Sequence, residues 1–206
     1  MKTLLKISVL GFAAALLTCG PLAAADSMTQ ALRPLKGAEF EQSFLTQMIH
    51  HHQQGIEMAK MVPHHTKRAE LTAFAEKMTM TQMADIEKMS ALLKSPAGSS
   101  PAKMDHSMMG DKKMDHSTMT DKKMNHAKTD GMKMSGASGM ESAQGPEFDR
   151  MFVQEMIKHH KSALEMAQLA EGRATRAEVI GIAQKISKEQ KDEIKELKSW
   201  EKKWNK

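Results

Sequence analysis

Apolar side chains recur at helical spacing in four long segments of the chain. In the first segment, at about 100° per residue, eight positions fall on one side while His50 points away from it. This side carries Phe44, Met48, His51, His52, Gly55, Met58, Ala59 and Val62. The pattern predicts an amphipathic helix that turns an adjacent pair of histidines toward the core.

The third segment repeats this pattern, with Lys158 at the outward position that His50 occupies in the first. Its inward side carries Met156, His159, His160, Ala163, Met166, Ala167 and Ala170. The outward residue differs between the two segments, whereas the inward His-His pair is the same in both. The inward pair is therefore the better candidate for a shared role.

The second and fourth segments also show one apolar stripe each, interrupted by a glutamine. The stripes consist of Leu71, Phe74, Ala75, Met78, Gln82, Ile86, Met89 and Leu93, and of Val179, Ile182, Ala183, Ile186, Gln190, Ile194 and Leu197. Pro63 and Gly172, which terminate helices, separate each stripe from the preceding one. Each pair of segments therefore predicts a helical hairpin.

The two predicted hairpins are copies of each other. The segment from Glu39 to Met89 recurs without a gap as Glu147 to Leu197. A single amphipathic hairpin cannot bury its apolar stripes alone, so we expect residues 26–94 and 147–206 to pack together. The fold class predicted is all-α, an antiparallel four-helix bundle of the ferritin-like kind.

Residues 95–146, between the hairpins, have a different composition. They are poor in Leu, Ile, Val and Phe, and contain a ten-residue period that begins at Met104, Met114 and Met124. A segment this polar cannot bury enough surface to fold. We expect a disordered Met/His-rich crossover, in which thioethers such as Met140 gain nothing from burial.

The N-terminus predicts a signal peptide over residues 1–25. Lys2 and Lys6 flank a short apolar run, and small residues at 23–25 supply a cleavage site. The single cysteine, Cys19, lies in this segment, and the Thr that precedes it fits lipid attachment poorly. We therefore expect a secreted or periplasmic mature chain that has no thiol and no membrane insertion.

Charge and composition exclude one class of partner and point to another. The formal net charge is +5, but acidic and basic residues are interleaved and Tyr is absent, so no nucleic-acid surface is expected. The chain has 21 Met and 10 His. Thioether sulfur and imidazole together suit monovalent copper or silver, and imidazole also binds divalent copper.

The candidate metal ligands fall into two groups. Those of the bundle are Met48, His51, His52, Met58, Met156, His159, His160 and Met166, with Gln82 and Gln190 as residues that orient the imidazoles. Those of the crossover are Met104, His106, Met109, Met114, His116, Met119, Met124 and His126. The sequence shows no Ser-His-Asp signature, no phosphate loop and no carboxylate pair with local support, so we expect no enzyme.

Four alternatives stay open at this stage. One is that the inward histidines and glutamines, with acidic residues, form a buried polar layer that sets helix register. A second is that the crossover arose by duplication of one short unit. A ferritin-like iron protein or oxidase requires Glu-x-x-His pairs, and none of the ten histidines has a Glu three residues before it. The last alternative is a structural bundle without a metal site, whose Met-rich surfaces accept partners.

The motif shared by both copies resembles the CopM-like family of secreted copper-binding proteins. The resemblance rests on Phe-x-x-x-Met-Ile-x-His-His, then Glu-Met-Ala, then a final helix with a terminal Trp, from about Glu39 to Trp200. It implies a ferritin-like bundle, copper binding in the periplasm and copper tolerance. As partners we expect copper ions and periplasmic copper export or chaperone components.

Overall fold

The computed structural model describes residues 24–95 and 139–204, and every regular element in these two ranges is an α-helix. The helices are α1 (Ala24–Leu32), α2 (Gly37–His65), α3 (Ala69–Lys94), α4 (Pro146–Arg173) and α5 (Ala177–Trp204). The predicted all-α class is confirmed. Within these ranges, no helix is both long and apolar enough to cross a membrane.

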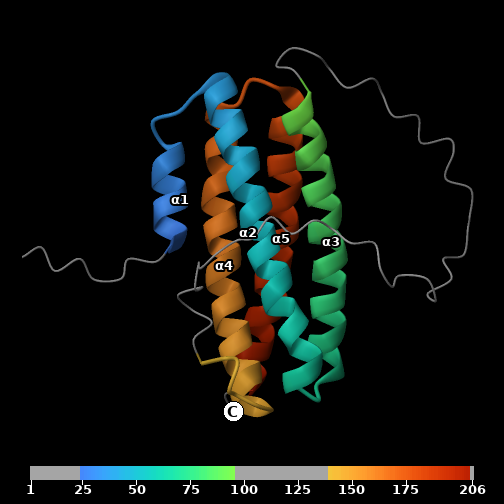
Figure 1. Ribbon diagram of the computed structural model, residues 1–206. Coiled ribbons are helices and arrows are strands. Elements are labelled where there is room, and N and C mark those ends of the chain that lie inside the picture. The colour runs from blue at the N-terminus through green and yellow to red at the C-terminus, as the bar shows by residue number, and fades with distance from the viewer. Residues whose placement is uncertain (1–23, 96–138, 205–206) are drawn as a thin grey trace, which may run out of the picture.

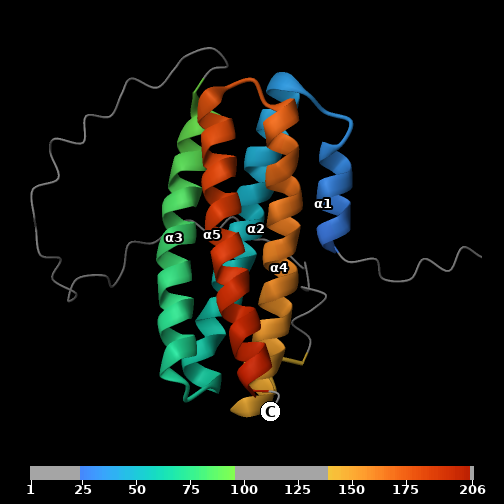
Figure 2. The ribbon, with the colours of Figure 1, turned by 180° about the vertical axis from the view of Figure 1, so that it is seen from behind.

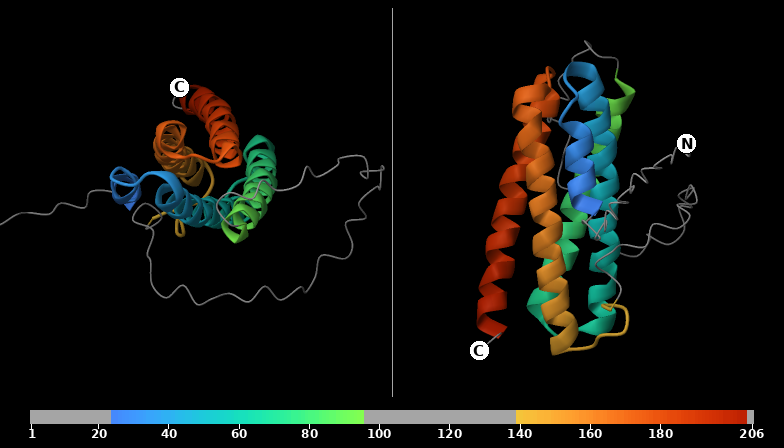
Figure 3. Two further views of the ribbon diagram at one scale, coloured as in Figure 1. Left: turned by 90° about the horizontal axis from the view of Figure 1, so that it is seen from above. Right: turned by 90° about the vertical axis from the view of Figure 1, so that its left-hand side faces the viewer.

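The four long helices form an antiparallel bundle (Figures 1 and 2). α2 and α3 make one hairpin and α4 and α5 the other, and seen from above the four surround a common axis (Figure 3). Between the hairpins, α2 packs closely against α4, whereas α3 and α5 contact each other sparsely. The main contact between the two hairpins is therefore that of α2 with α4.

The short helix α1 was not among the predicted elements. It lies outside the bundle against α4 and α2 (Figure 1). Its Leu32 is fully buried and its half-buried Met28 packs on the same apolar cluster. The rest of the predicted signal peptide, and most of the predicted crossover, lie outside the described residues.

A glycine in a left-handed conformation precedes the body of each first helix. Gly37, at the start of α2, and Gly145, just before α4, both have a φ of +56°. A Cβ at either residue would meet no atom within 4 Å, so the backbone angle and not the space explains the glycine. The two copies therefore share a glycine of positive φ at the start of their first helix.

The core consists of two apolar clusters with a polar layer between them. The first contains Met48 of α2 and Met166 of α4, and the second contains Met58 and Met156 of the same helices. On each helix the histidine pair lies between the two methionines in sequence. The layer that divides the core is therefore made of imidazoles.

The prediction for Met140 was wrong. Residues 139–145 form turns, and Met140 is fully buried in the second apolar cluster. The backbone N–H of Gly145 donates to the carbonyl oxygen of His65 at 2.7 Å, which ties this segment to the end of α2. Local composition does not reveal such burial, because the apolar cluster around Met140 is made of residues from both hairpins.

Candidate metal centre

The structure brings the four inward histidines together at the α2–α4 contact. The ring centroids of His51 and His159 are 3.7 Å apart and the rings are stacked at 27°. His52 and His160 flank them, at 6.4 Å from His51 and 6.1 Å from His159 respectively. Because α2 and α4 are antiparallel copies, the equivalent residues His51 and His159 meet on a pseudo-twofold axis.

Small residues allow this approach. A Cβ at Gly55 would lie 2.6 Å from Oε1 of Gln82 and 3.0 Å from Cε1 of His159. The equivalent residue of α4 is Ala163, which is fully buried. The missing side chain at Gly55 therefore provides the space that Gln82 and His159 occupy.

Most ring nitrogens of this cluster are buried without a hydrogen-bond partner. This holds for Nδ1 and Nε2 of both His51 and His159, and for Nδ1 of both His52 and His160. Leaving a buried polar group unpaired costs about 1–3 kcal/mol. Several such groups side by side indicate a site that is arranged for something other than stability.

Burial keeps the central imidazoles neutral. Burial lowers the pKa of His51 well below 6.5, and its proximity to His159, His52 and His160 lowers it further. Burial, with His160 and His52 nearby, lowers the pKa of His159 to about 3. Both rings are therefore deprotonated at neutral pH, which is the form that binds a metal ion.

A carboxylate contacts each flanking histidine. Nε2 of His52 lies 3.8 Å from Oδ2 of Asp85, and Nε2 of His160 lies 2.7 Å from Oε2 of Glu193. Burial alone would raise the pKa of Asp85, but the neighbouring His52 and the hydrogen bond from Nζ of Lys185, at 2.8 Å, lower it. A carboxylate on one ring nitrogen orients an imidazole and leaves the other nitrogen for a metal.

The carboxylates lie within ion-pair distance of the flanking imidazoles, whereas no hydrogen bond joins Gln82 to a histidine. Both amide atoms of Gln82 and Oε1 of Gln190 are buried without a hydrogen-bond partner. The predicted orienting role of Gln82 therefore has no hydrogen bond to support it. Asp85 and Glu193 were missed, although they occupy equivalent positions of the two copies and are acidic in both.

The predicted thioether ligands lie on both sides of the imidazole layer. Met48 and Met156 each precede the first histidine of a pair by one helical turn, and both are fully buried. Met58 and Met166 follow the pairs and are also buried. Soft donors thus border the imidazoles along the bundle axis.

The four histidines lie together, but their ring nitrogens do not point toward one common position. Stacked imidazoles point their nitrogens in parallel, so a metal ion shared by His51 and His159 requires the rings to rotate. Among the described residues, no three His, Cys, Asp or Glu side chains are arranged to hold a metal ion. The ferritin-like iron site considered above therefore has no support in this part of the chain.

The remaining predicted positions lie elsewhere. His50 is half-buried and its Nε2 lies 3.2 Å from Nε2 of Gln54, outside the layer. Lys158, its counterpart, is exposed and pairs with Glu155 at 2.6 Å. The eight crossover candidates, Met104, His106, Met109, Met114, His116, Met119, Met124 and His126, lie outside the described residues.

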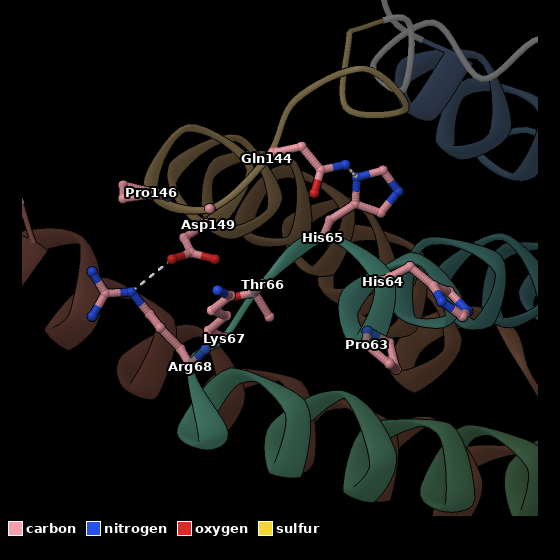
Figure 4. A pocket seen from close by; sticks show the side chains of 10 residues that line it. Pro63, His64, His65, Thr66, Lys67, Arg68, Gln144, Pro146 and Asp149 are labelled. Carbon is pink, nitrogen blue, oxygen red and sulfur yellow. Dashed lines mark hydrogen bonds and ion pairs between the residues drawn. The ribbon is translucent and has the colours of Figure 1, made fainter.

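A surface pocket of about 570 Å³ lies at the α2–α3 loop (Figure 4). Three of its polar side chains are already engaged: Nε of Arg68 donates to Oδ2 of Asp149 at 2.7 Å, and Nδ1 of His65 lies 2.8 Å from the Ala143 carbonyl oxygen. Lys67 adds a second cation to its lining. The pocket is therefore a weaker candidate for a metal than the buried layer.

Comparison with known sequences decides the family. The profile described as "Domain of unknown function (DUF305)" matches residues 17–93 and 97–205. The chain belongs to the DUF305 family. No curated protein matches this DUF305 chain.

Solved structures agree with this assignment and with the predicted resemblance. The protein is similar to CopM in its Cu(I)-bound form, with 26% identity, a TM-score of 0.56, and coverage of 80% of this chain and 96% of that chain. CopM in an Ag-bound form gives the same values. A DUF305 protein from Streptomyces coelicolor, at 21% identity and a TM-score of 0.59, covers 80% of this chain and 94% of its own, and supports the fold alone.

Proposed function

We propose that this DUF305 protein binds copper in the periplasm or outside the cell and sequesters or buffers it, which contributes to copper tolerance. The observation that carries the proposal is the buried layer of neutral imidazoles with unpaired ring nitrogens. Support also comes from CopM, which has been solved in Cu(I)-, Cu(II)- and Ag-bound forms. We infer silver as a second ion that the same donors accept.

The chemistry of the donors favours soft ions. Neutral imidazole and thioether prefer monovalent copper or silver, whereas calcium and magnesium require clusters of oxygen ligands. His51, His52, His159 and His160 supply the nitrogens, and Met48 and Met156 lie one turn away on the same inward faces. Asp85 and Glu193 then orient the flanking rings. We propose a binding protein, not an enzyme, that exchanges copper with export or chaperone components.

The experiment replaces the central pair by leucine in the full mature chain. His51→Leu with His159→Leu removes four buried unpaired nitrogens, so the metal-free protein should be at least as stable as the parent. In the parent, Cu(I) should raise the melting temperature, and in the double variant most of this rise should disappear. Calorimetry with and without Cu(I) measures both quantities.

His50→Leu is the matched control, because His50 precedes the same pair but lies outside the layer. It should leave the copper-induced rise unchanged. The competing structural interpretation predicts the opposite pattern for the double variant. If the metal-free double variant loses stability while the copper-induced rise stays at the parental value, the layer sets helix register and is not a metal site.

A further inference from the structure

Two large apolar side chains are exposed on α3, although they lie on a helix whose other side is buried. Met80 is 72% exposed and Met83 is 50% exposed. They are the exposed large hydrophobic residues of the described part of the chain. A single exposed apolar residue is ordinary, but two thioethers one turn apart form a pair.

The pair lies on a stripe with acidic ends. Glu76, Met80, Met83 and Glu87 follow a spacing of four, three and four residues, which places them on one face of a helix. All four are exposed. Glu76 therefore lies one turn before Met80, and Glu87 one turn after Met83.

The second copy provides an internal control for this stripe. Its equivalent positions on α5 are Gln184, Lys188, Lys191 and Lys195, and all four are exposed as well. The same helical face thus carries thioethers and carboxylates on one hairpin, and an amide and three ammonium groups on the other. The equivalent residues of α3 and α5 lie in the same fold and are exposed in both copies, so packing does not explain Met80 and Met83.

Packing also fails to explain the pair on α3 itself. Met78 and Met89 face the core and are fully buried, as expected for methionine used as filler. Met80 and Met83 are directed to water, where a lysine or glutamate is the ordinary choice. An exposed thioether keeps one chemical property that water does not weaken, which is its affinity for soft metal ions.

We propose that Met80 and Met83 form a surface site for a monovalent soft cation, Cu(I) or Ag(I), with Glu76 and Glu87 supplying negative charge on either side. This site is separate from the buried imidazole layer and rests on the proposed copper-binding function. Methionine has three rotatable side-chain bonds, so two sulfur atoms one turn apart can turn toward one ion. The site contains no nitrogen donor, which disfavours divalent copper.

The position on the surface makes this a site for rapid exchange. The thioethers are neutral and solvent-accessible, so binding requires neither deprotonation nor rotation of packed rings. The carboxylates attract a cation toward the stripe. The equivalent face of α5 carries three lysines instead, of which Lys195 pairs with Asp192 at 2.9 Å. The α3 face therefore serves as a weak entry or transfer site.

The test follows the methionine methyl groups by NMR in the full mature chain. Protein labelled with ¹³C at the methionine ε-methyl is titrated with Ag(I) in chloride-free buffer, and Met80→Leu and Met83→Leu assign the two signals. The signals of Met80 and Met83 should move together, with one binding curve. Met80→Leu should weaken the response of Met83 about tenfold or more, because one donor of two is lost. Met78, buried on the opposite face of the same turn, is the control and should not follow this curve.

A transplant gives the matched gain of function. Lys188→Met with Lys191→Met, together with Gln184→Glu and Lys195→Glu, should create two new methyl signals that shift together with Ag(I).

In the parent site, Glu76→Gln with Glu87→Gln should weaken binding about threefold, because exposed charges each contribute only a fraction of a kcal/mol. The helical content should be unchanged in both variants, since all substituted residues are exposed.

Two results would overturn the inference. One is an equally strong response of Met83 after Met80→Leu, which shows independent thioethers. The other is that both signals stay fixed while other methionines shift, in which case silver still binds and the proposed function survives without this site. If no methionine signal responds to Ag(I) and Cu(I) leaves the melting temperature unchanged in calorimetry, both proposals fail together.

Discussion

At the residue scale, the central feature is a stack of two neutral histidines, His51 and His159, at the contact between α2 and α4. Helical periodicity was sufficient to place His51, His52, His159 and His160 on inward faces, because each face is a property of one helix. It could not identify Asp85 or Glu193, because their contacts cross between helices. Asp85 is buried, whereas the predicted stripe of α3 passed through Ile86, which is only half-buried. The buried face of α3 is therefore rotated slightly about the helix axis from the predicted stripe, and this places the carboxylate of Asp85 at the histidine layer.

The lowered pKa values of His51 and His159 predict acid sensitivity of the metal-free fold. The unfolded chain binds a proton on each histidine near pH 6.5, whereas the fold resists protonation until lower pH, about 3 for His159. Stability is therefore complete above pH 6.5 and falls as the pH drops toward 3, by about 1.4 kcal/mol per pH unit for each such histidine. Urea unfolding at pH 7, 5 and 4 in the presence of a chelator measures this slope.

His159→Leu is the informative variant for this pH dependence. It should reduce the pH dependence of the free energy of unfolding by about 1.4 kcal/mol per pH unit, which is the contribution of one histidine. His50→Leu should leave this pH dependence unchanged. An unaltered slope in His159→Leu would show that His159 is accessible to protons in the folded state.

At the element scale, each hairpin loop is fastened to the other hairpin by an equivalent ion pair. Nε of Arg176 donates to Oε2 of Glu41 at 2.6 Å, and Nε of Arg68 donates to Oδ2 of Asp149 at 2.7 Å. These residues hold equivalent positions, so the two contacts lie at opposite ends of the bundle.

The repeat allowed the pairing of hairpins to be predicted from sequence. The contacts that fasten them were missed, although acid and arginine are present in both copies.

The two ion pairs differ in how fully the carboxylate is used. Oε1 of Glu41 accepts hydrogen bonds from Thr175 N, Thr175 Oγ1 and Arg176 N, at 2.7, 2.8 and 2.8 Å. Oδ1 of Asp149, in contrast, is buried without a partner. Glu41 therefore caps the start of α5 in addition to pairing with arginine.

This difference predicts unequal costs for matched substitutions. Glu41→Gln should lower the free energy of unfolding by about 2–3 kcal/mol, and Asp149→Asn by about 1 kcal/mol. Burial would raise the pKa of Glu41, but its hydrogen bonds from Arg176 and Thr175 lower it below 4.5. The contribution of Glu41 is thus complete above pH 4.5 and is lost as the pH falls below it.

Urea unfolding at pH 7 compares the two variants, with the exposed Glu39→Gln as control. Glu39→Gln should change stability little. Equal losses in Glu41→Gln and Asp149→Asn would show that the additional hydrogen bonds of Glu41 contribute nothing.

At the scale of the whole molecule, the order of the helices requires a long connection. α3 ends where Nη1 of Arg176 donates to the carbonyl oxygen of Leu92, at the end of the bundle where α5 begins. α4 begins at the opposite end, where Gly145 contacts His65. The chain between them must therefore cover the length of α3, whose 26 residues span about 39 Å. Sequence composition predicted a crossover but gave no distance for it.

This distance predicts how short the connection can become. An extended chain covers at most about 3.3–3.6 Å per residue, so about 12 residues are the minimum for 39 Å. Replacing residues 96–138 by about 25 Gly/Ser residues should keep a monomer with the parental helical content. The replacement must end before Gly139, because Met140 is part of the core.

Replacement by about 6 Gly/Ser residues should prevent α4 from reaching its place in the same chain. Each first hairpin would then pair with the second hairpin of another chain, because the apolar stripes and the ion pairs remain intact. Light scattering should show a dimer, while circular dichroism should show the same helical content as the monomer. A folded monomer with the parental melting temperature would mean that α4 starts beside the end of α3, which contradicts the topology described above.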